Sequence, residues 1–114
     1  MDTLVAARRV GGRGRVIGVD FSPAMLARAL QAVIEDGALN VELRRGDAEA
    51  IPLDNECVDR VLINGIFNLN PARDAIFREV ARVVRPGGCV YASELTLNEP
   101  LSDEESVSAT NWFA

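Results

Sequence analysis

Strand-like and helix-like patterns of apolar residues alternate along this chain. Short runs rich in β-branched residues, such as Val16, Ile17 and Val19, are typical of buried parallel strands. One further segment alternates apolar and polar residues, as half-buried strands do. Together these patterns predict strands over residues 15–20, 41–45, 58–64 and 89–95.

Segments with apolar residues at helical spacing separate the predicted strands, except that a loop over residues 46–52 and a polar turn over residues 53–57 join the strands at 41–45 and 58–64. They predict the end of a helix at residues 3–9, a helix over residues 23–35 and a third helix opened by Asn70 and Pro71. Ser22 and Pro23 form a good helix start, while Gly37 and residues 85–88 (RPGG) form stops. This alternation predicts an α/β fold, with a Rossmann-like, doubly wound parallel sheet in a single domain over residues 1–114.

Composition and charge limit the classes of protein that fit. A net charge of −5 argues against nucleic acid or an anionic membrane surface as a partner, and no apolar run is long enough to span a membrane. The chain has no histidine, which removes histidine-based metal sites and Ser-His or Cys-His catalysis, so we expect no metal. Cys57 and Cys89 lie far apart in the sequence, and we expect buried, inert thiols in a reducing, cytoplasmic setting.

Asp20 is the first candidate functional residue, because it ends a predicted strand just before a helix start. Ligands of open α/β sheets bind outside the carboxyl ends of the strands, where an acid typically accepts the hydroxyl groups of a ribose. The sequence therefore favours a nucleoside ligand, with Phe21 and Met25 flanking the plane of its base. The alternatives are an acid that merely favours the helix dipole and a Met25 that belongs to the core.

Asp47 and Ala48 follow the next predicted strand. A carboxylate can accept a hydrogen bond from an exocyclic amine, and the following N–H can reach a ring nitrogen, which together match the edge of adenine. The alternative is an Asx turn after Gly46. The pairing with Asp20 at the neighbouring strand end favours adenine recognition.

Asn64 and Gly65 end the third predicted strand. Asn64 offers a donor and an acceptor to a zwitterionic ligand tail, with a simple strand cap as the alternative. Glu94, near the end of the last strand, is interpreted as a solvated acid. Residues 11–14 (GGRG) follow a helix and precede a strand, the reverse of a phosphate-binding loop, so they predict a turn.

Four segments resemble signatures of the class I S-adenosylmethionine-dependent methyltransferases. They are residues 16–25 (VIGVDFSPAM), 46–53 (GDAEAIPL), 58–64 (VDRVLIN) and 77–88 (FREVARVVRPGG). Within the class, residues 63–71 (INGIFNLNP) resemble the branch of arsenite methyltransferases and quinone-biosynthesis C-methyltransferases. The resemblance implies that Asp20 binds the ribose of S-adenosylmethionine, Met25 packs on the adenine, Asp47 and Ala48 contact its edge, and Asn64 lines the methionine side.

The sequence departs from this family at three places. The family's glycine-rich loop, which follows a central strand, would precede the first helix, and the region that completes the substrate pocket would follow the last strand. We therefore expect a truncated sheet, in which the strands 15–20 and 58–64 each keep an unpaired edge. These edges either meet or pair with another chain, so we expect a homo-oligomer that binds the cofactor poorly by itself. Neither Gly65 nor Phe67 is the cysteine usual in arsenite methyltransferases.

The function expected from these observations is transfer of a methyl group from S-adenosylmethionine to a small-molecule acceptor. No catalytic residue or general base can be assigned from the sequence. One alternative is a nicotinamide-dependent dehydrogenase, which shares the ribose acid but needs a glycine fingerprint that this chain lacks. The other is a catalytically silent interaction module that retains the sheet for assembly.

Overall fold

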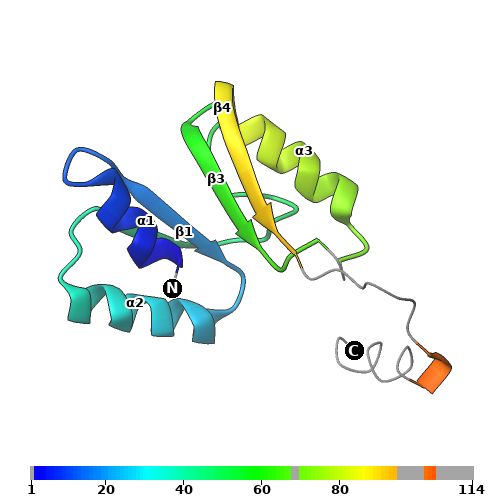
Figure 1. The fold of residues 1–114 in the computed structure, drawn as a ribbon, viewed down its shortest axis with the longest axis horizontal. Coiled ribbons are helices and arrows are strands. Elements are labelled where there is room, and N and C mark those ends of the chain that lie inside the picture. Colours follow the sequence, from blue (N-terminus) through cyan, green and yellow to red (C-terminus); the bar gives the residue numbers. More distant parts are fainter. Residues whose placement is uncertain (1, 68–69, 95–101, 105–114) are drawn as a thin grey trace.

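The structure is a computed structural model that describes residues 2–67, 70–94 and 102–104. Helices and strands alternate along it, except that no helix separates β2 from β3 (Figure 1). In chain order the elements are α1 (Asp2–Val10), β1 (Val16–Asp20), α2 (Pro23–Asp36), β2 (Val41–Arg45), β3 (Val58–Asn64), α3 (Arg73–Val83) and β4 (Val84–Ser93). The α/β fold class is confirmed, and β2 and β3 have the predicted bounds.

The four strands form two parallel pairs. β1 pairs with β2 in register from Val16 beside Val41 to Asp20 beside Arg45, and β3 pairs with β4. No ladder joins β1 to β3 in the described residues. The free edges of β1 and β3 were expected either to pair with each other or to pair with another chain. The first of these does not occur within this part of the chain.

Local signals explain how α2 begins and ends beside the first strand pair. The Ser22 hydroxyl oxygen accepts the Met25 N–H at 3.3 Å, and Gly37 closes the helix in the left-handed conformation with φ 73°. The Asn40 amide before β2 donates to the carbonyl oxygens of Ala7 and Gly11 at 2.9 and 3.0 Å, which ties α1 to the same strand pair. Both helices thus gather at β1 and β2 (Figure 1).

The main core lies between α3 and one face of the β3–β4 pair. Its buried members are Ile63, Phe67, Ile76 and Val80. The opposite face of these strands is open: Leu62 and Tyr91, which lie side by side in the register, are each 56% exposed. None of the helices in the described residues is long and apolar enough to span a membrane.

The start of β4 differs from the prediction. Residues 85–88 were expected to separate the helix from a strand beginning at Cys89, but α3 ends at Val83 and Val84 is already extended beside Val58. The 85–88 segment therefore lies inside β4, where the register shifts. Val84 packs against the α3 core, which favours the early start. The expected last residue of this strand, Leu95, lies outside the described residues.

The expectation of two buried thiols was also wrong. Cys57 is half-buried and Cys89 is exposed, and both are free. Cys89 lies beside Arg60 on the face of the β3–β4 pair that α3 does not cover, which explains its exposure.

Candidate cofactor-binding site

Asp20 is the last residue of β1, and one of its two carboxylate oxygens accepts a hydrogen bond. Its Oδ1 accepts the N–H of Ser22 at 2.9 Å, so the acid does support the helix start locally. Its Oδ2 has no hydrogen-bond partner within the described residues. One carboxylate oxygen therefore remains available to accept hydrogen bonds from a ligand.

The turn of Asp47 and Ala48 lies directly beside this strand end. Gly46, at the start of the turn, donates its N–H to the Asp20 carbonyl oxygen at 3.1 Å. Asp47 Oδ1 accepts the Glu49 N–H at 3.1 Å, which is the Asx geometry considered from the sequence. The local turn and a ligand role are compatible, because the second Asp47 oxygen and the Ala48 N–H have no partner in the described part of the chain.

Phe21 and Met25 lie next to Asp20 and are open to solvent. Phe21 is 72% exposed and Met25 is 49% exposed, although both carry large apolar side chains. The structure therefore removes the alternative that Met25 is a core residue. Exposed apolar side chains beside a polar strand end offer a surface on which the face of a nucleotide base can pack.

Asn64 lies apart from this group. It ends β3 and is exposed, beside Ser93 in the register. Gly65 follows with φ 69°, a value that favours glycine, and donates its N–H to the Ser93 carbonyl oxygen at 2.9 Å. The structure thus brings five predicted residues together at the carboxyl ends of β1 and β2, and it places the sixth at the carboxyl end of β3.

The sequence analysis interpreted Glu94 as a solvated acid and so missed its structural role. Its Oε1 accepts the N–H groups of Ile66 and Phe67 at 2.9 and 3.0 Å, directly after Asn64 and Gly65. A glutamate just past the end of a strand was the available signal, but only the β3–β4 pairing shows which amides it reaches. The loop is further supported by the ring of Phe67, which stacks on Phe77 with centroids 4.3 Å apart.

A second feature that the sequence interpretation missed is the pair of Glu79 and Arg82 on α3. The Arg82 guanidinium donates from Nε to Glu79 Oε2 at 2.7 Å. This hydrogen bond holds the pKa of the Glu79 carboxyl below its ordinary value and raises the pKa of Arg82. Both groups therefore stay charged near neutral pH.

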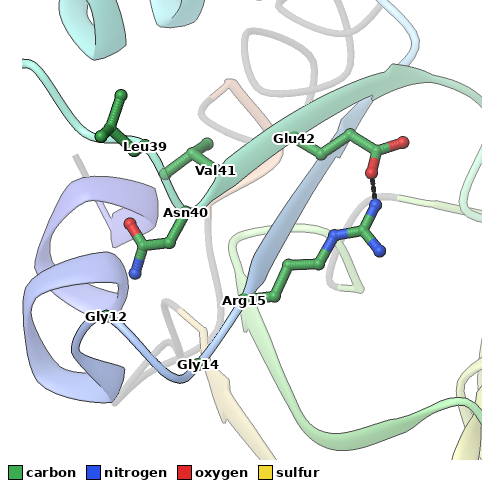
Figure 2. Close-up of a pocket in the computed structure, with 7 residues that line it drawn as sticks. All are labelled: Gly12, Gly14, Arg15, Leu39, Asn40, Val41 and Glu42. Carbon is green, nitrogen blue, oxygen red and sulfur yellow. Dashed lines mark ion pairs between the residues drawn. The ribbon is translucent and has the colours of Figure 1, made fainter.

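The pocket in Figure 2 lies at the other end of the first strand pair. It is lined by Gly12, Gly14, Arg15, Leu39, Asn40, Val41 and Glu42. The ion pair between Arg15 and Glu42 occupies one side of it (Figure 2). Gly14 donates its N–H to the Gly11 carbonyl oxygen at 3.1 Å, so residues 11–14 form the predicted turn. The pocket lies at the amino ends of β1 and β2, away from Asp20.

Parallel strands with polar groups at their carboxyl ends are typical of a Rossmann-like fold. A crystal structure of an S-adenosylmethionine-dependent methyltransferase from Aquifex aeolicus matches the structure with a TM-score of 0.74 and 23% identity, over 93% of this chain and 61% of that one. The [4+2]-cyclase SpnF matches with a TM-score of 0.76 and 25% identity, over 88% of this chain and 37% of that one.

The chain belongs to the family described as a methyltransferase domain, which its residues 2–88 match. It is 39% identical over 103 residues to the arsenite methyltransferase of Halobacterium salinarum, covering 90% of this chain and 26% of that protein. It is 36% identical over 98 residues to the demethylmenaquinone methyltransferase of Bacillus subtilis, covering 85% of this chain and 42% of that protein. The chain thus spans well under half the length of these relatives. The predicted resemblance is confirmed, and S-adenosylmethionine is the cofactor of this class.

Proposed function

We propose that this chain supplies the adenosine-binding part of an S-adenosylmethionine-dependent methyltransferase with a small-molecule acceptor. The observation that carries the proposal is the free carboxylate oxygen of Asp20, held beside the turn of Asp47 and Ala48. The names of the two relatives, which specify arsenite and demethylmenaquinone, support a small acceptor. Family membership favours methyl transfer over nicotinamide-dependent oxidation.

The residues present fit the cofactor's nucleoside. Asp20 Oδ2 would accept ribose hydroxyl hydrogens, and the exposed side chains of Phe21 and Met25 would cover the base. The second oxygen of Asp47 would accept from the exocyclic amine, while the Ala48 N–H would donate to a ring nitrogen. When bound, S-adenosylmethionine supplies an electrophilic methyl group on its sulfonium.

The residues of this chain would contribute binding and orientation to catalysis. Holding a methyl donor in line with an acceptor contributes a large part of the rate in such reactions. Asn64, at the carboxyl end of β3, would take the amino-acid end of the cofactor through its amide donor and acceptor.

Two substitutions at Asp20 test the ribose assignment. Asp20→Asn keeps an oxygen for the Ser22 N–H but removes the charge, whereas Asp20→Ala removes both. A lost charge-assisted bond of about 1.5–3 kcal/mol lowers affinity by about 10- to 160-fold. We expect a loss in this range for Asp20→Ala and a smaller one for Asp20→Asn, in titrations of S-adenosylhomocysteine followed by NMR. Asp74→Asn, at an exposed acid on α3, is the control, and equal affinity in all four proteins would contradict the assignment.

A substitution at Asp47 tests the adenine assignment separately. A carboxylate only accepts hydrogen bonds, so it should favour the exocyclic amine of adenine over the carbonyl oxygen of hypoxanthine. We expect the wild type to prefer S-adenosylhomocysteine over its inosine analogue, and Asp47→Asn to lose this preference. An unchanged preference would leave Asp47 as a turn residue.

We also propose that the chain associates with a second copy through the free edge of β1. Val16 donates its N–H to the Asn40 carbonyl oxygen at 2.9 Å, and the Asp20 carbonyl oxygen accepts the Gly46 N–H at 3.1 Å. Because main-chain groups alternate in direction along a strand, those of Ile17 and Val19 point away from β2. Unpaired groups on an apolar strand are a template for pairing with another chain.

Light scattering tests this association. Val19→Pro removes one N–H of the free edge without removing a bond to β2, so it should shift the chain toward the monomer, whereas Val19→Thr should not. A monomeric wild type would contradict the proposal. Self-association without binding of S-adenosylhomocysteine would favour the silent interaction module.

The free thiols of Cys57 and Cys89 support a cytoplasmic location.

A further inference from the structure

The segment 51–55, between β2 and β3, is hydrogen-bonded to one arginine of α3. Arg82 donates to the Ile51 carbonyl oxygen at 2.9 Å and to the Leu53 carbonyl oxygen at 2.7 Å. It also donates to Asn55 Oδ1 at 3.0 Å. A planar guanidinium with five N–H groups can serve three oxygens at once, which an ammonium group cannot do in a fixed geometry.

Glu79 completes this arrangement. Its carboxylate accepts from Arg82 and also accepts the Ile51 N–H at 2.9 Å, so both main-chain groups of Ile51 are bonded to the same charged pair. The lowered pKa of the Glu79 carboxyl is consistent with this geometry. The pair is therefore built around one main-chain position rather than being a simple surface ion pair.

Arg44 of β2 holds the same segment from the other strand pair. It donates to the Pro52 carbonyl oxygen at 2.9 Å, and its Nε donates to Glu42 at 2.6 Å. The three consecutive carbonyl oxygens of residues 51–53 thus accept from two arginines, one on β2 and one on α3, which packs against the β3–β4 pair. The segment is fixed relative to both pairs.

This segment follows the candidate adenine-binding turn without a break. The Asp47 carbonyl oxygen accepts the Ala50 N–H at 3.0 Å, directly before Ile51. A Cβ added at Gly46 would lie 2.5 Å from the Pro52 ring, so the two ends of the turn are in close contact. A shift of the 51–55 segment would therefore move Asp47 and Ala48 relative to Asp20.

We propose that Arg82 is a positioning residue that sets the place of Asp47 and Ala48 through the 51–55 segment, and so sets the selectivity of the site for adenine. This inference rests on the function proposed above. It differs from a purely stabilising role, because a stabilising contact would change the unfolding free energy without changing which base is preferred.

Three variants separate the two roles. Arg82→Gln removes the charge, and Arg82→Lys keeps the charge but loses the planar group that serves several oxygens. Arg78→Gln is the matched control, since Arg78 is exposed on the same helix and its Nε donates to the Asp74 carbonyl oxygen one turn earlier, at 3.3 Å. Glu79→Gln is a milder fourth variant, in case Arg82→Gln does not fold.

The experiment measures ligand preference and loop protection in the full chain. NMR titration to millimolar concentrations compares S-adenosylhomocysteine with its inosine analogue, and hydrogen exchange follows the amides of residues 48–51. We expect an adenine preference of about tenfold or more in the wild type and Arg78→Gln, the size of one lost charge-assisted bond. Both Arg82 variants should lose most of it, with faster exchange confined to this turn.

The outcomes distinguish this inference from the proposed function. A wild type that binds neither ligand refutes the proposed function, and with it the selectivity role. A wild type that prefers adenine, together with Arg82 variants that keep the preference, refutes the positioning role alone, even if they unfold at lower temperature. Recovery of the preference in Arg82→Lys would also refute it, because charge alone would then suffice.

Discussion

Removing the Glu94 carboxylate should destabilise the loop that follows β3. Phe67 is 7% exposed, so its N–H would be left without an acceptor where water has little access, whereas Ile66 is 39% exposed and water can replace the lost oxygen. A hydrogen bond to a charged group contributes about 1.5–3 kcal/mol. Because only one of the two amides loses its acceptor without replacement, we expect Glu94→Ala to lower the free energy of unfolding by about 1.5–3 kcal/mol.

Urea denaturation followed by circular dichroism measures this loss. The corresponding fall in melting temperature is about 6–13 °C for a domain of this length. Glu94→Gln keeps an acceptor oxygen but no charge, so it should cost about 0.5–1.5 kcal/mol. Glu35→Ala is the control, because Glu35 is exposed on α2 and its contact with Gln31 is worth only about 0.2–0.5 kcal/mol.

Two results would refute this reasoning. Equal unfolding free energies for Glu94→Ala and Glu35→Ala would mean that the two amides gain nothing from the carboxylate. A larger loss for Glu94→Gln than for Glu94→Ala would mean that the side chain acts through its shape rather than as an acceptor. The expected order from least to most destabilised is Glu35→Ala, Glu94→Gln, Glu94→Ala.

Three further outcomes follow from the described contacts. Ile76 is 1% exposed in the α3 core, so Ile76→Ala should lower the unfolding free energy by about 2–5 kcal/mol and Ile76→Val by about 0.5–1.5 kcal/mol in urea denaturation. The pKa of Glu79 lies below its ordinary value of 4.5 in the folded chain, so its stabilising effect is complete above that pH and is lost as the pH falls through the folded-state pKa. The urea concentration at half-unfolding, measured between about pH 3 and 7, should therefore decrease less as the pH is lowered for Glu79→Gln than for the wild type. A Cβ at Gly88 would lie 2.7 Å from the Asp59 carbonyl oxygen, so Gly88→Ala should lower the melting temperature by more than Gly12→Ala, where no atom lies within 4 Å.

Short-range chemistry in the sequence determined most elements and their order. Ser22 and Gly37 delimit α2 through bonds to residues within one turn, and Pro23 favours the first helical position through its fixed φ, so their effects are visible without any tertiary contact. The same holds for the apolar pattern of the strands at residues 41–45 and 58–64. Asp20 and Asp47 could be chosen as candidates because the carboxyl ends of parallel strands lie at one edge of a sheet.

Tertiary structure decided what depends on partners distant in sequence. Glu94 reaches the Phe67 amide across 27 positions, and Arg82 reaches the Ile51 carbonyl across 31, so no local pattern could reveal either contact. The early start of β4 at Val84 likewise depends on packing against α3, which competes with the turn preference of residues 85–88. The sequence by itself determined the α/β order and the acids at the strand ends. Only the fold decided which main-chain groups Glu94 and Arg82 bind, because strand pairing and core packing bring together segments that are distant along the chain.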